Sequence, residues 1–240
     1  MLILILAFIL SPRGEIVGGG ESSPFHRVRD CIQKFRNYGP ISEEERKFLS
    51  NDEDLIMIRN LEVTITSRQS GVKAMRYELA MKSLYAKTGD VLLIAKKFNL
   101  PPMVVAKQLN IPLTNDILEA DLGSSVNMAI TKAESQSYED QVGEKLKDIG
   151  LDFYSEKELR EKKSLLTPDY LIKDPPVLFR GKEVFWLDAK NYPLYNNRTV
   201  IRGLIKQAKK YNEAFGPGAM IFRRVIEEVP IGCMIVEMPL

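Results

Sequence analysis

The sequence predicts an α+β protein with a helical N-terminal region and a C-terminal region that combines helices with strands. Between residues 41 and 122 the apolar residues recur at helical spacing, and short turns separate the segments. After Ser135 one amphipathic helix precedes short apolar runs bounded by Pro, Gly or charged residues, as strands are. The order expected from residue 135 onward is helix, strand, strand, helix, strand, strand, which is a mixed α/β arrangement.

The chain of 240 residues is long enough for one large domain or two small ones. We expect a segment of uncertain structure over residues 1–40, a helical domain over 41–122 and a mixed domain over 135–240. Residues 111–134 are polar and serve as the connection. The formal net charge is only +2, so any nucleic-acid contact requires a local arrangement of basic residues.

The N-terminus and the rare residue types restrict the class of protein. Met1 to Leu10 is an apolar run too short to span a bilayer, so no membrane association is expected. This run has three possible interpretations: a targeting segment, a buried strand, or residues that precede the true start of the protein. Cys31 and Cys233 have no disulfide or metal-ligand spacing, and the single His26, expected in a solvated loop, excludes a zinc site with two imidazoles. Any metal ion should be a hard cation held by carboxylates.

The helical domain contains one sharp local pattern. Ser42 precedes three glutamates and resembles a helix start, and residues 72–86 read as a second helix that ends at Thr88-Gly89-Asp90. Residues 91–98 and 103–109 then predict two short helices around a tight turn, which resembles a helix-turn-helix. Only Lys107 is basic on the second helix, so both a DNA-reading helix and a plain packed hairpin stay open.

The helix predicted over residues 135–149 carries an acid at the edge of its apolar stripe. Tyr138, Val142, Leu146 and Ile149 share one face at 100° per residue. Glu139 lies beside that face, where an uncompensated charge is costly. A metal ion or a basic side chain would compensate it, and a surface ion pair is the simpler alternative.

Two predicted strands bring further polar residues together. One begins at Thr167-Pro168-Asp169, and the other covers residues 183–190 and ends in Asp188-Ala189-Lys190. Alternation places Asp188 and Lys190 on one face beside Trp186. If the intervening loop is symmetric about Leu178-Phe179, antiparallel pairing sets Asp169 opposite Asp188, with Cβ atoms roughly 4.5–5.5 Å apart.

Paired carboxylates of this kind suit a divalent cation. Asp169 and Asp188, with Glu139 as a further ligand or base, offer hard oxygen donors to Mg²⁺ or Mn²⁺. Such an ion lowers the pKa of a bound water and screens charge on a phosphate, while Lys190 can position the water or stabilise the phosphate. A salt bridge at a strand end is the alternative, but it explains only Asp188 and Lys190.

The helix predicted over residues 199–215 has an apolar face and a basic face. Gln207 and Tyr211 lie one turn apart at the edge of the apolar face, where Gln207 could reach the rim of the site. The opposite face could contact phosphates, or it could be an ordinary solvated face. Its basic residues are Arg202, Lys206, Lys209 and Lys210.

Glu139, Pro168-Asp169 and Asp188-Ala189-Lys190 resemble the motif of the PD-(D/E)xK nuclease superfamily, and Gln207 with Tyr211 resembles the Q-x-x-x-Y helix of its RecB-like and resolvase-like branches. Thr167-Pro168-Asp169, residues 185–190 and residues 215–218 further resemble the codanin-interacting nuclease, or TPD-motif, family. Asp188 stands where some members carry Glu.

The resemblance implies a restriction-endonuclease-like αβββαβ core, preceded by a helical, helix-turn-helix-like domain. It also implies Mg²⁺-dependent hydrolysis of nucleic acid, with DNA expected, a codanin-like partner, and a location in nucleus and cytoplasm. Two other classes stay open: a catalytically silent scaffold with a nuclease fold, and a helix-turn-helix DNA-binding or interaction protein.

Overall fold

The computed structural model describes residues 24–174, 177–179 and 181–240, so the apolar run from Met1 to Leu10 lies outside the described residues. The described chain divides into two compact units, residues 24–133 and residues 134–240 with those gaps. The mixed α+β architecture expected from the sequence is confirmed. No helix of the described chain is long and apolar enough to cross a membrane.

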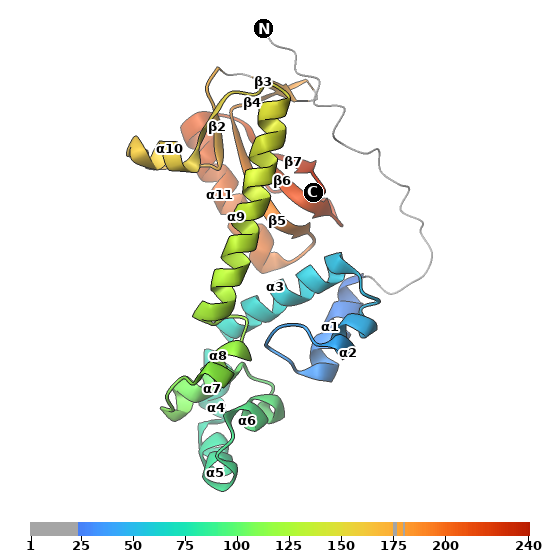
Figure 1. Cartoon of the computed structure of the whole chain (residues 1–240), viewed down its shortest axis with the longest axis vertical. Coiled ribbons are helices and arrows are strands. Elements are labelled where there is room, and N and C mark those ends of the chain that lie inside the picture. Colours follow the sequence, from blue (N-terminus) through green and yellow to red (C-terminus); the bar gives the residue numbers. More distant parts are fainter. Residues whose placement is uncertain (1–23, 175–176, 180) are drawn as a thin grey trace. The chain divides into compact units, whose positions relative to one another are not determined.

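The regular structure described in the first unit is helical (Figure 1). Its helices are α1 (Pro24–Phe35), α2 (Glu43–Phe48), α3 (Glu53–Gln69), α4 (Gly71–Arg76), α5 (Glu78–Thr88), α6 (Val91–Phe98), α7 (Pro102–Leu109), α8 (Asn115–Glu119) and the start of α9 (Ser125–Asp148).

Three expectations for this unit need correction. The helix expected over residues 72–86 is two helices, because the chain breaks at Tyr77 between α4 and α5. The polar connection expected over residues 111–134 contains α8 and the first turns of α9. His26 is exposed as expected, but it lies in α1 and not in a loop.

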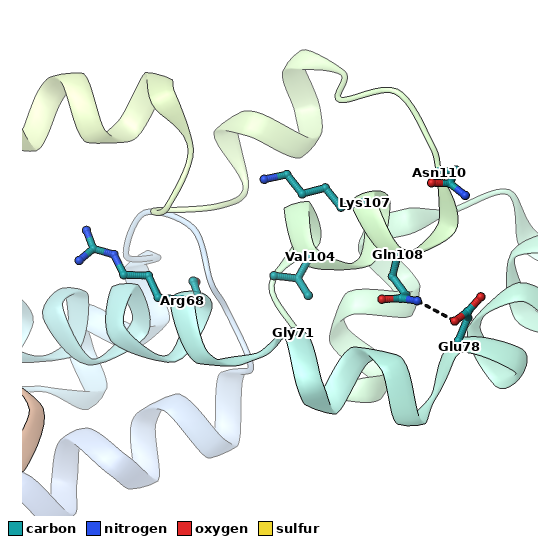
Figure 2. A pocket seen from close by; sticks show the side chains of 8 residues that line it. Arg68, Gly71, Glu78, Val104, Lys107, Gln108 and Asn110 are labelled. Atoms are coloured by element: carbon teal, nitrogen blue, oxygen red, sulfur yellow. Dashed lines mark hydrogen bonds between the residues drawn. The ribbon is translucent and has the colours of Figure 1, made fainter.

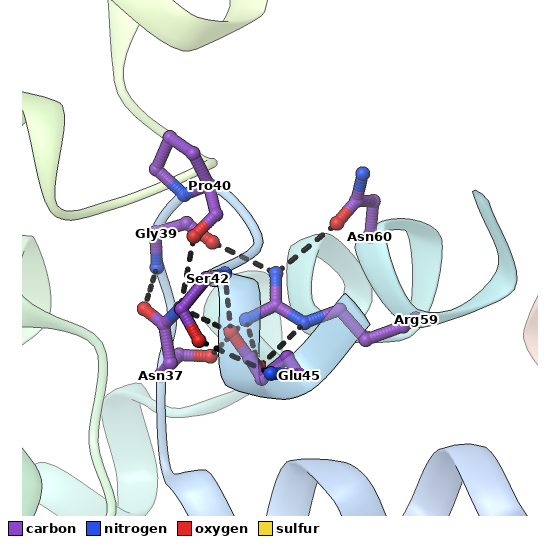
Figure 3. A network of polar contacts seen from close by, with 7 residues as sticks. All are labelled: Asn37, Gly39, Pro40, Ser42, Glu45, Arg59 and Asn60. Carbon is purple, nitrogen blue, oxygen red and sulfur yellow. Dashed lines mark hydrogen bonds and ion pairs between the residues drawn. The ribbon is translucent and has the colours of Figure 1, made fainter. Parts of the chain in front are cut away.

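A buried ion pair joins α2 to α3 (Figure 3). The Arg59 and Glu45 side chains are both 0% exposed, and the Arg59 Nη2 atom lies 2.7 Å from Glu45 Oε1. Glu45 also closes the capping box of α2, since its Oε2 accepts the Ser42 backbone N–H at 2.9 Å. This pair therefore fixes the start of α2 against α3.

Helices α6 and α7 pack closely around the turn that the sequence predicts. Asn99 ends α6 in the left-handed conformation (φ 51°), and Pro101 and Pro102 begin α7. Ala95, Leu100 and Ala106 are buried in the core between the helices. The small side chains of Ala95 and Ala106 allow this close packing.

The second unit is built on a five-stranded mixed sheet in the order β1-β2-β5-β6-β7. Strands β1, β2 and β5 are antiparallel neighbours, whereas β5-β6 and β6-β7 are parallel. The elements after α9 are β1 (Phe153–Ser155), α10 (Glu156–Glu161), β2 (Tyr170–Ile172), β3 (Val177–Phe179), β4 (Lys182–Val184), β5 (Trp186–Leu194), α11 (Arg198–Phe215), β6 (Gly218–Val225) and β7 (Met234–Glu237).

Helices α9 and α11 cover opposite faces of this sheet (Figure 1). Tyr138, Val142 and Leu146 of α9 join one core cluster with Leu187 and Ala189 of β5. Leu204 and Ala208 of α11 join another, on the other face of β5. Alternate residues of β5 therefore face different helices, and Asp188 points toward α11.

The chain entering β6 is shaped around Trp186. The indole Nε1 donates to the Gly216 carbonyl at 3.0 Å, and a Cβ on Gly218 would lie 2.2 Å from the indole ring. Gly216 also has a φ of +92°, which glycine adopts readily. The absence of a side chain at Gly218 thus leaves room for the Trp186 indole, which lies on the same face of β5 as Asp188.

Candidate active site

Asp169 and Asp188 lie next to each other at the junction of β2 and β5. The register pairs Tyr170 with Leu187, so its continuation by one residue sets Asp169 opposite Asp188. This is the register expected from the sequence, although the hairpin β3-β4 stands where a simple symmetric loop was assumed. The Asp169 Oδ2 atom accepts the Ala189 backbone N–H at 2.7 Å, which directs this carboxylate toward β5.

Asp188 is 2% exposed and is held by side chains from two directions. The Lys190 ammonium donates to its Oδ1 atom. Gln207 Nε2 donates to its Oδ2 atom at 2.9 Å from α11. The structure thus brings Asp169, Asp188, Lys190 and Gln207 into one polar cluster within an apolar core.

Tyr211 connects this cluster to the segment that precedes β2. Its hydroxyl donates to the Thr167 carbonyl at 3.2 Å and lies 3.4 Å from Gln207 Nε2, which donates to it. The ring packs edge-on against Trp186, with centroids 5.1 Å apart. Tyr211 and Gln207 therefore orient the carboxylate cluster from α11.

Burial raises the pKa of both carboxyl groups, and the charge of Asp188 adds to the shift at Asp169. Burial, followed by the charge of Asp188, raises the pKa of Asp169 to about 8. Burial also raises the pKa of Asp188, even though Lys190 opposes the shift. For Lys190, burial lowers the pKa, but the charges of Asp188, Tyr192 and Asp169 and the hydrogen bond to Asp188 together outweigh it, so the net pKa is raised. Lys190 therefore stays protonated beside two carboxyl groups whose ionised forms are disfavoured.

The raised pKa of Asp169 predicts that the cation-free protein loses stability as pH rises from about 4 to about 8. The folded state binds the carboxyl proton more tightly than the unfolded state across that window, so ionisation favours unfolding, by at most about 1.4 kcal/mol per pH unit for one proton. Thermal denaturation in EDTA should show the midpoint falling across this range. Asp169→Asn should flatten the dependence, and a midpoint that rises with pH would contradict the assignment.

Glu139 lies on α9 at the edge of the cluster and is half-buried. Burial, then the charges of Glu156 and Asp188, raise its pKa. Its backbone carbonyl accepts the Tyr170 hydroxyl, which fixes this turn of α9 to β2. Glu156, which the sequence analysis did not single out, thus contributes a fourth carboxylate near the site.

Asp169 and Asp188 are the donors that could hold a divalent cation. Among the described residues, no three acidic, His or Cys side chains group closely enough to hold an ion. Mg²⁺ needs fewer protein ligands, because it is commonly bound by one or two carboxylates together with waters and substrate phosphates. A cation would also relieve the repulsion between the two carboxylates, so this donor set fits Mg²⁺ or Mn²⁺. Glu139 as a further ligand stays a prediction.

The basic face expected on α11 is present at the surface. Arg202, Lys206, Lys209 and Lys210 are all exposed, and Lys209 lies 3.8 Å from Glu213. The apolar side chain of Ile205 on the same helix is also 44% exposed. The role of Arg202, Lys206 and Lys210 in substrate binding stays a prediction.

The helical unit has an open polar pocket of its own, with a volume of about 430 Å³ (Figure 2). Arg68 and Lys107 line it from α3 and α7, and both side chains are exposed. The Ser67 hydroxyl in its wall is buried, with no hydrogen-bond partner in the described structure. Gln108 donates to Glu78 at 2.7 Å on another side. The pocket therefore presents two cations to solvent, and an unpaired hydroxyl lies buried in its wall.

Comparison with known proteins matches residues 105–227 to the family described as "Protein of unknown function TPD sequence-motif". The chain is 44% identical over 81 residues to "Uncharacterized protein L539" of Acanthamoeba polyphaga mimivirus, an alignment that covers 32% of this chain and 30% of that protein. It is 28% identical over 130 residues to "CDAN1-interacting nuclease 1" of Danio rerio, covering 54% of this chain and 41% of that protein.

The matched segments thus span between about a third and two fifths of these relatives' lengths. No solved structure matches significantly. The family match covers more than half of the chain and includes Asp169, Asp188 and Lys190. The chain belongs to the TPD sequence-motif family.

Proposed function

We propose that the protein is a nuclease that hydrolyses phosphodiester bonds of nucleic acid, with Mg²⁺ or Mn²⁺ as cofactor and DNA as the expected substrate. The observation that carries this proposal is the convergence of Asp169, Asp188 and Lys190, with Gln207 bonded to Asp188, on β5 and its neighbours. The name of the Danio rerio relative, a nuclease, supports the same chemistry.

The order of elements supports a PD-(D/E)xK type of nuclease core. In the main sheet, α9 precedes the antiparallel strands β1, β2 and β5, and α11 then leads to the parallel strand β6. This is the αβββαβ order of that superfamily, apart from the additional α10, the hairpin β3-β4 and β7. Asp169 directly precedes the second of these strands, β2, and Asp188 lies on the third, β5, which is consistent with the superfamily motif.

Each residue of the cluster would have a distinct part in the reaction. Asp169 and Asp188 would hold the cation, which supplies a bound water of lowered pKa and charge screening for the phosphate. Lys190, kept protonated by Asp188, would stabilise negative charge that develops on the phosphate or position the attacking water. Glu139, with its raised pKa, could accept a proton, and Gln207 would keep Asp188 oriented.

The test is to incubate the full chain with single-stranded, linear double-stranded and branched DNA, and with RNA, with and without Mg²⁺ or Mn²⁺. We expect cation-dependent cleavage of at least one DNA substrate. No cation-dependent cleavage of any substrate would overturn the proposal and favour a silent scaffold with a nuclease fold.

We also propose that the protein acts with a codanin-like partner in the nucleus and cytoplasm. The name of the Danio rerio relative supports such a partner, and the alignment to it covers 54% of this chain. A co-precipitation of the full chain with the codanin of the same cell would test the association. Failure of the two proteins to associate would overturn the partner proposal without affecting the proposed chemistry.

A second role, nucleic-acid contact by the helical unit, is favoured by the pocket beside α7. Arg68 and Lys107 offer two cations beside about 430 Å³ of open space, and the buried Ser67 hydroxyl has no hydrogen-bond partner among the described residues. Cations of this kind are usual contacts to backbone phosphates. If α6 and α7 act as a helix-turn-helix, the second helix, α7, would enter the groove, and Lys107 lies on that helix.

Replacement of both Arg68 and Lys107 by Ala should therefore weaken DNA binding with a characteristic salt dependence. Loss of two phosphate contacts should make the plot of log Kobs against log salt shallower by roughly 2. The matched control is Arg76→Ala with Lys97→Ala, which removes two exposed charges of the same unit outside the pocket. Equal salt slopes in the two double variants would rule out the pocket as the contact.

A further inference from the structure

Asp169 precedes β2 and is not one of the residues that pair β2 with β5. Strand β2 begins at Tyr170, and the pairs between β2 and β5 are Tyr170–Leu187 and Leu171–Trp186. The preceding Pro168 has no N–H to donate, although its ring fixes its own φ. The direction of the Asp169 carboxylate therefore depends on whatever holds the three residues Thr167, Pro168 and Asp169.

The first turn of α10 holds this segment at both ends. The Glu156 backbone N–H donates to the Asp169 carbonyl at 3.1 Å. The Thr167 hydroxyl donates to Glu156 Oε1 at 3.3 Å. Glu156 is itself anchored, because Arg160 donates to the same oxygen at 2.6 Å, and the helix that begins at Glu156 is capped by Ser155, whose hydroxyl accepts the Glu158 backbone N–H. One residue of α10 thus bonds to the backbone of Asp169 and to the side chain of Thr167.

The opposite side of the segment is held from α11. Tyr211 donates to the Thr167 carbonyl, and Gln207 connects Tyr211 to Asp188. Thr167 is therefore the residue at which the contacts from α10 and from α11 meet. The Thr167 hydroxyl, through its hydrogen bond to Glu156, connects α10 to the segment that carries Asp169.

We propose that Thr167 is a positioning residue of the site: its hydroxyl, bonded to Glu156, fixes the segment 167–169 and so keeps the Asp169 carboxylate directed at the Ala189 N–H and at Asp188. This inference rests on the proposed function where catalysis is concerned, but the geometry of the segment can be measured independently of turnover. Thr167 does not contact the reacting atoms and acts through Asp169 alone.

The structure offers a closely matched pair of variants. Thr167→Val keeps the shape of the side chain and removes the hydroxyl, whereas Thr167→Ser keeps the hydroxyl and removes a methyl group. Glu156→Ala breaks the same hydrogen bond from the other side. In ¹H–¹⁵N spectra of the full chain, the Ala189 amide reports the Asp169 carboxylate directly, because it donates to Oδ2 at 2.7 Å.

Thr167→Val and Glu156→Ala are expected to shift the Ala189 amide resonance and to speed its exchange with solvent, and Thr167→Ser should resemble the wild type. In nuclease assays Thr167→Val should lower kcat about 10–100-fold, as loss of groups that orient a ligand does, with KM for DNA unchanged. Thr167→Ser should restore most of the activity.

The proposal is overturned if a folded Thr167→Val or Glu156→Ala variant leaves the Ala189 amide unchanged, or if Thr167→Ser is as impaired as Thr167→Val. A wild-type protein without any cleavage would instead overturn the proposed function. In that case the Ala189 measurement still decides whether Thr167 positions Asp169, so the two failures are distinguishable.

Discussion

Replacement of Asp188 by Asn should lower cation-dependent DNA cleavage on the order of 10³-fold, the scale of losing a charged group aimed at the reacting centre. Asn keeps the size of the side chain and its contact with Gln207 but removes the proposed cation ligand and the charge opposite Lys190. Replacement of Lys190 by Met should also abolish most of the activity, because it removes the protonated group beside the phosphate position.

The same Asp188 variant removes a carboxylate whose ionised form burial disfavours but leaves the Lys190 ammonium without that partner, so its thermal midpoint in EDTA should change little. Burial raises the pKa of Asp188, which means that the ionised carboxylate is disfavoured in the folded state. Loss of activity together with a nearly unchanged thermal midpoint would separate a chemical role from misfolding.

The measurement is single-turnover cleavage of the best DNA substrate, with thermal denaturation of each variant in EDTA. Asp152→Asn is the matched control, because Asp152 is 66% exposed and pairs with Lys173 at 2.9 Å, away from the Asp169–Asp188 cluster. Cleavage that persists in both Asp188→Asn and Lys190→Met would show that the catalytic residues lie elsewhere in the chain.

The centre of the candidate site was predictable because it depends on local rules. Alternation along a strand puts Asp188 and Lys190 on one face, and two strands close in sequence pair with a register that opposes Asp169 to Asp188. Helix ends marked by a glycine or a capping residue were also predictable from the sequence. Gly89 ends α5 in the left-handed conformation, and Asp90 caps α6, as the sequence at Thr88-Gly89-Asp90 indicates.

The parts that the sequence analysis missed give little periodic signal. Strand β1 has three residues and α10 has six, too few for an apolar period to emerge, so Glu156 and its bond to Thr167 were not expected. In the first turns of α9, Val126, Met128 and Ile130 are exposed, so the apolar residues there do not follow one buried helical face. The Ser155-x-x-Glu158 capping box was the one available signal for α10.

The pair of Glu45 and Arg59 shows the same limit for long-range contacts. The two residues lie fourteen positions apart on different helices, and each is of a charged type that is common on exposed helix faces. Their complete burial follows from how α2 packs on α3, which no local pattern reports. A single sequence therefore shows the paired carboxylates of a site more readily than the buried charges of a scaffold.

Replacement of Arg59 by Met is expected to destabilise the helical unit by about 3–5 kcal/mol, the cost of leaving a buried charge without its partner. All five N–H donors of Arg59 are used: two reach Glu45 Oε1, and the others reach the Gly39 and Asn37 carbonyls and the Asn60 side chain (Figure 3). The variant leaves the Glu45 carboxylate and both carbonyls without these partners, with only Asn37 and Ser42 still bonded to Glu45.

Urea denaturation followed by far-UV circular dichroism measures this change. The control is Arg46→Met, since Arg46 and Glu53 form a pair of similar length, 2.9 Å, whose side chains are 36% and 69% exposed. That loss should cost about 1 kcal/mol or less, because solvent already screens an exposed pair.

The double variant Glu45→Met with Arg59→Met should recover part of the loss by removing both buried charges, but not all of it, because the Gly39 and Asn37 carbonyls still lack their donors. Equal costs for Arg59→Met and Arg46→Met would show that solvent reaches the Glu45–Arg59 pair in solution, since burial is the main physical difference between the two ion pairs.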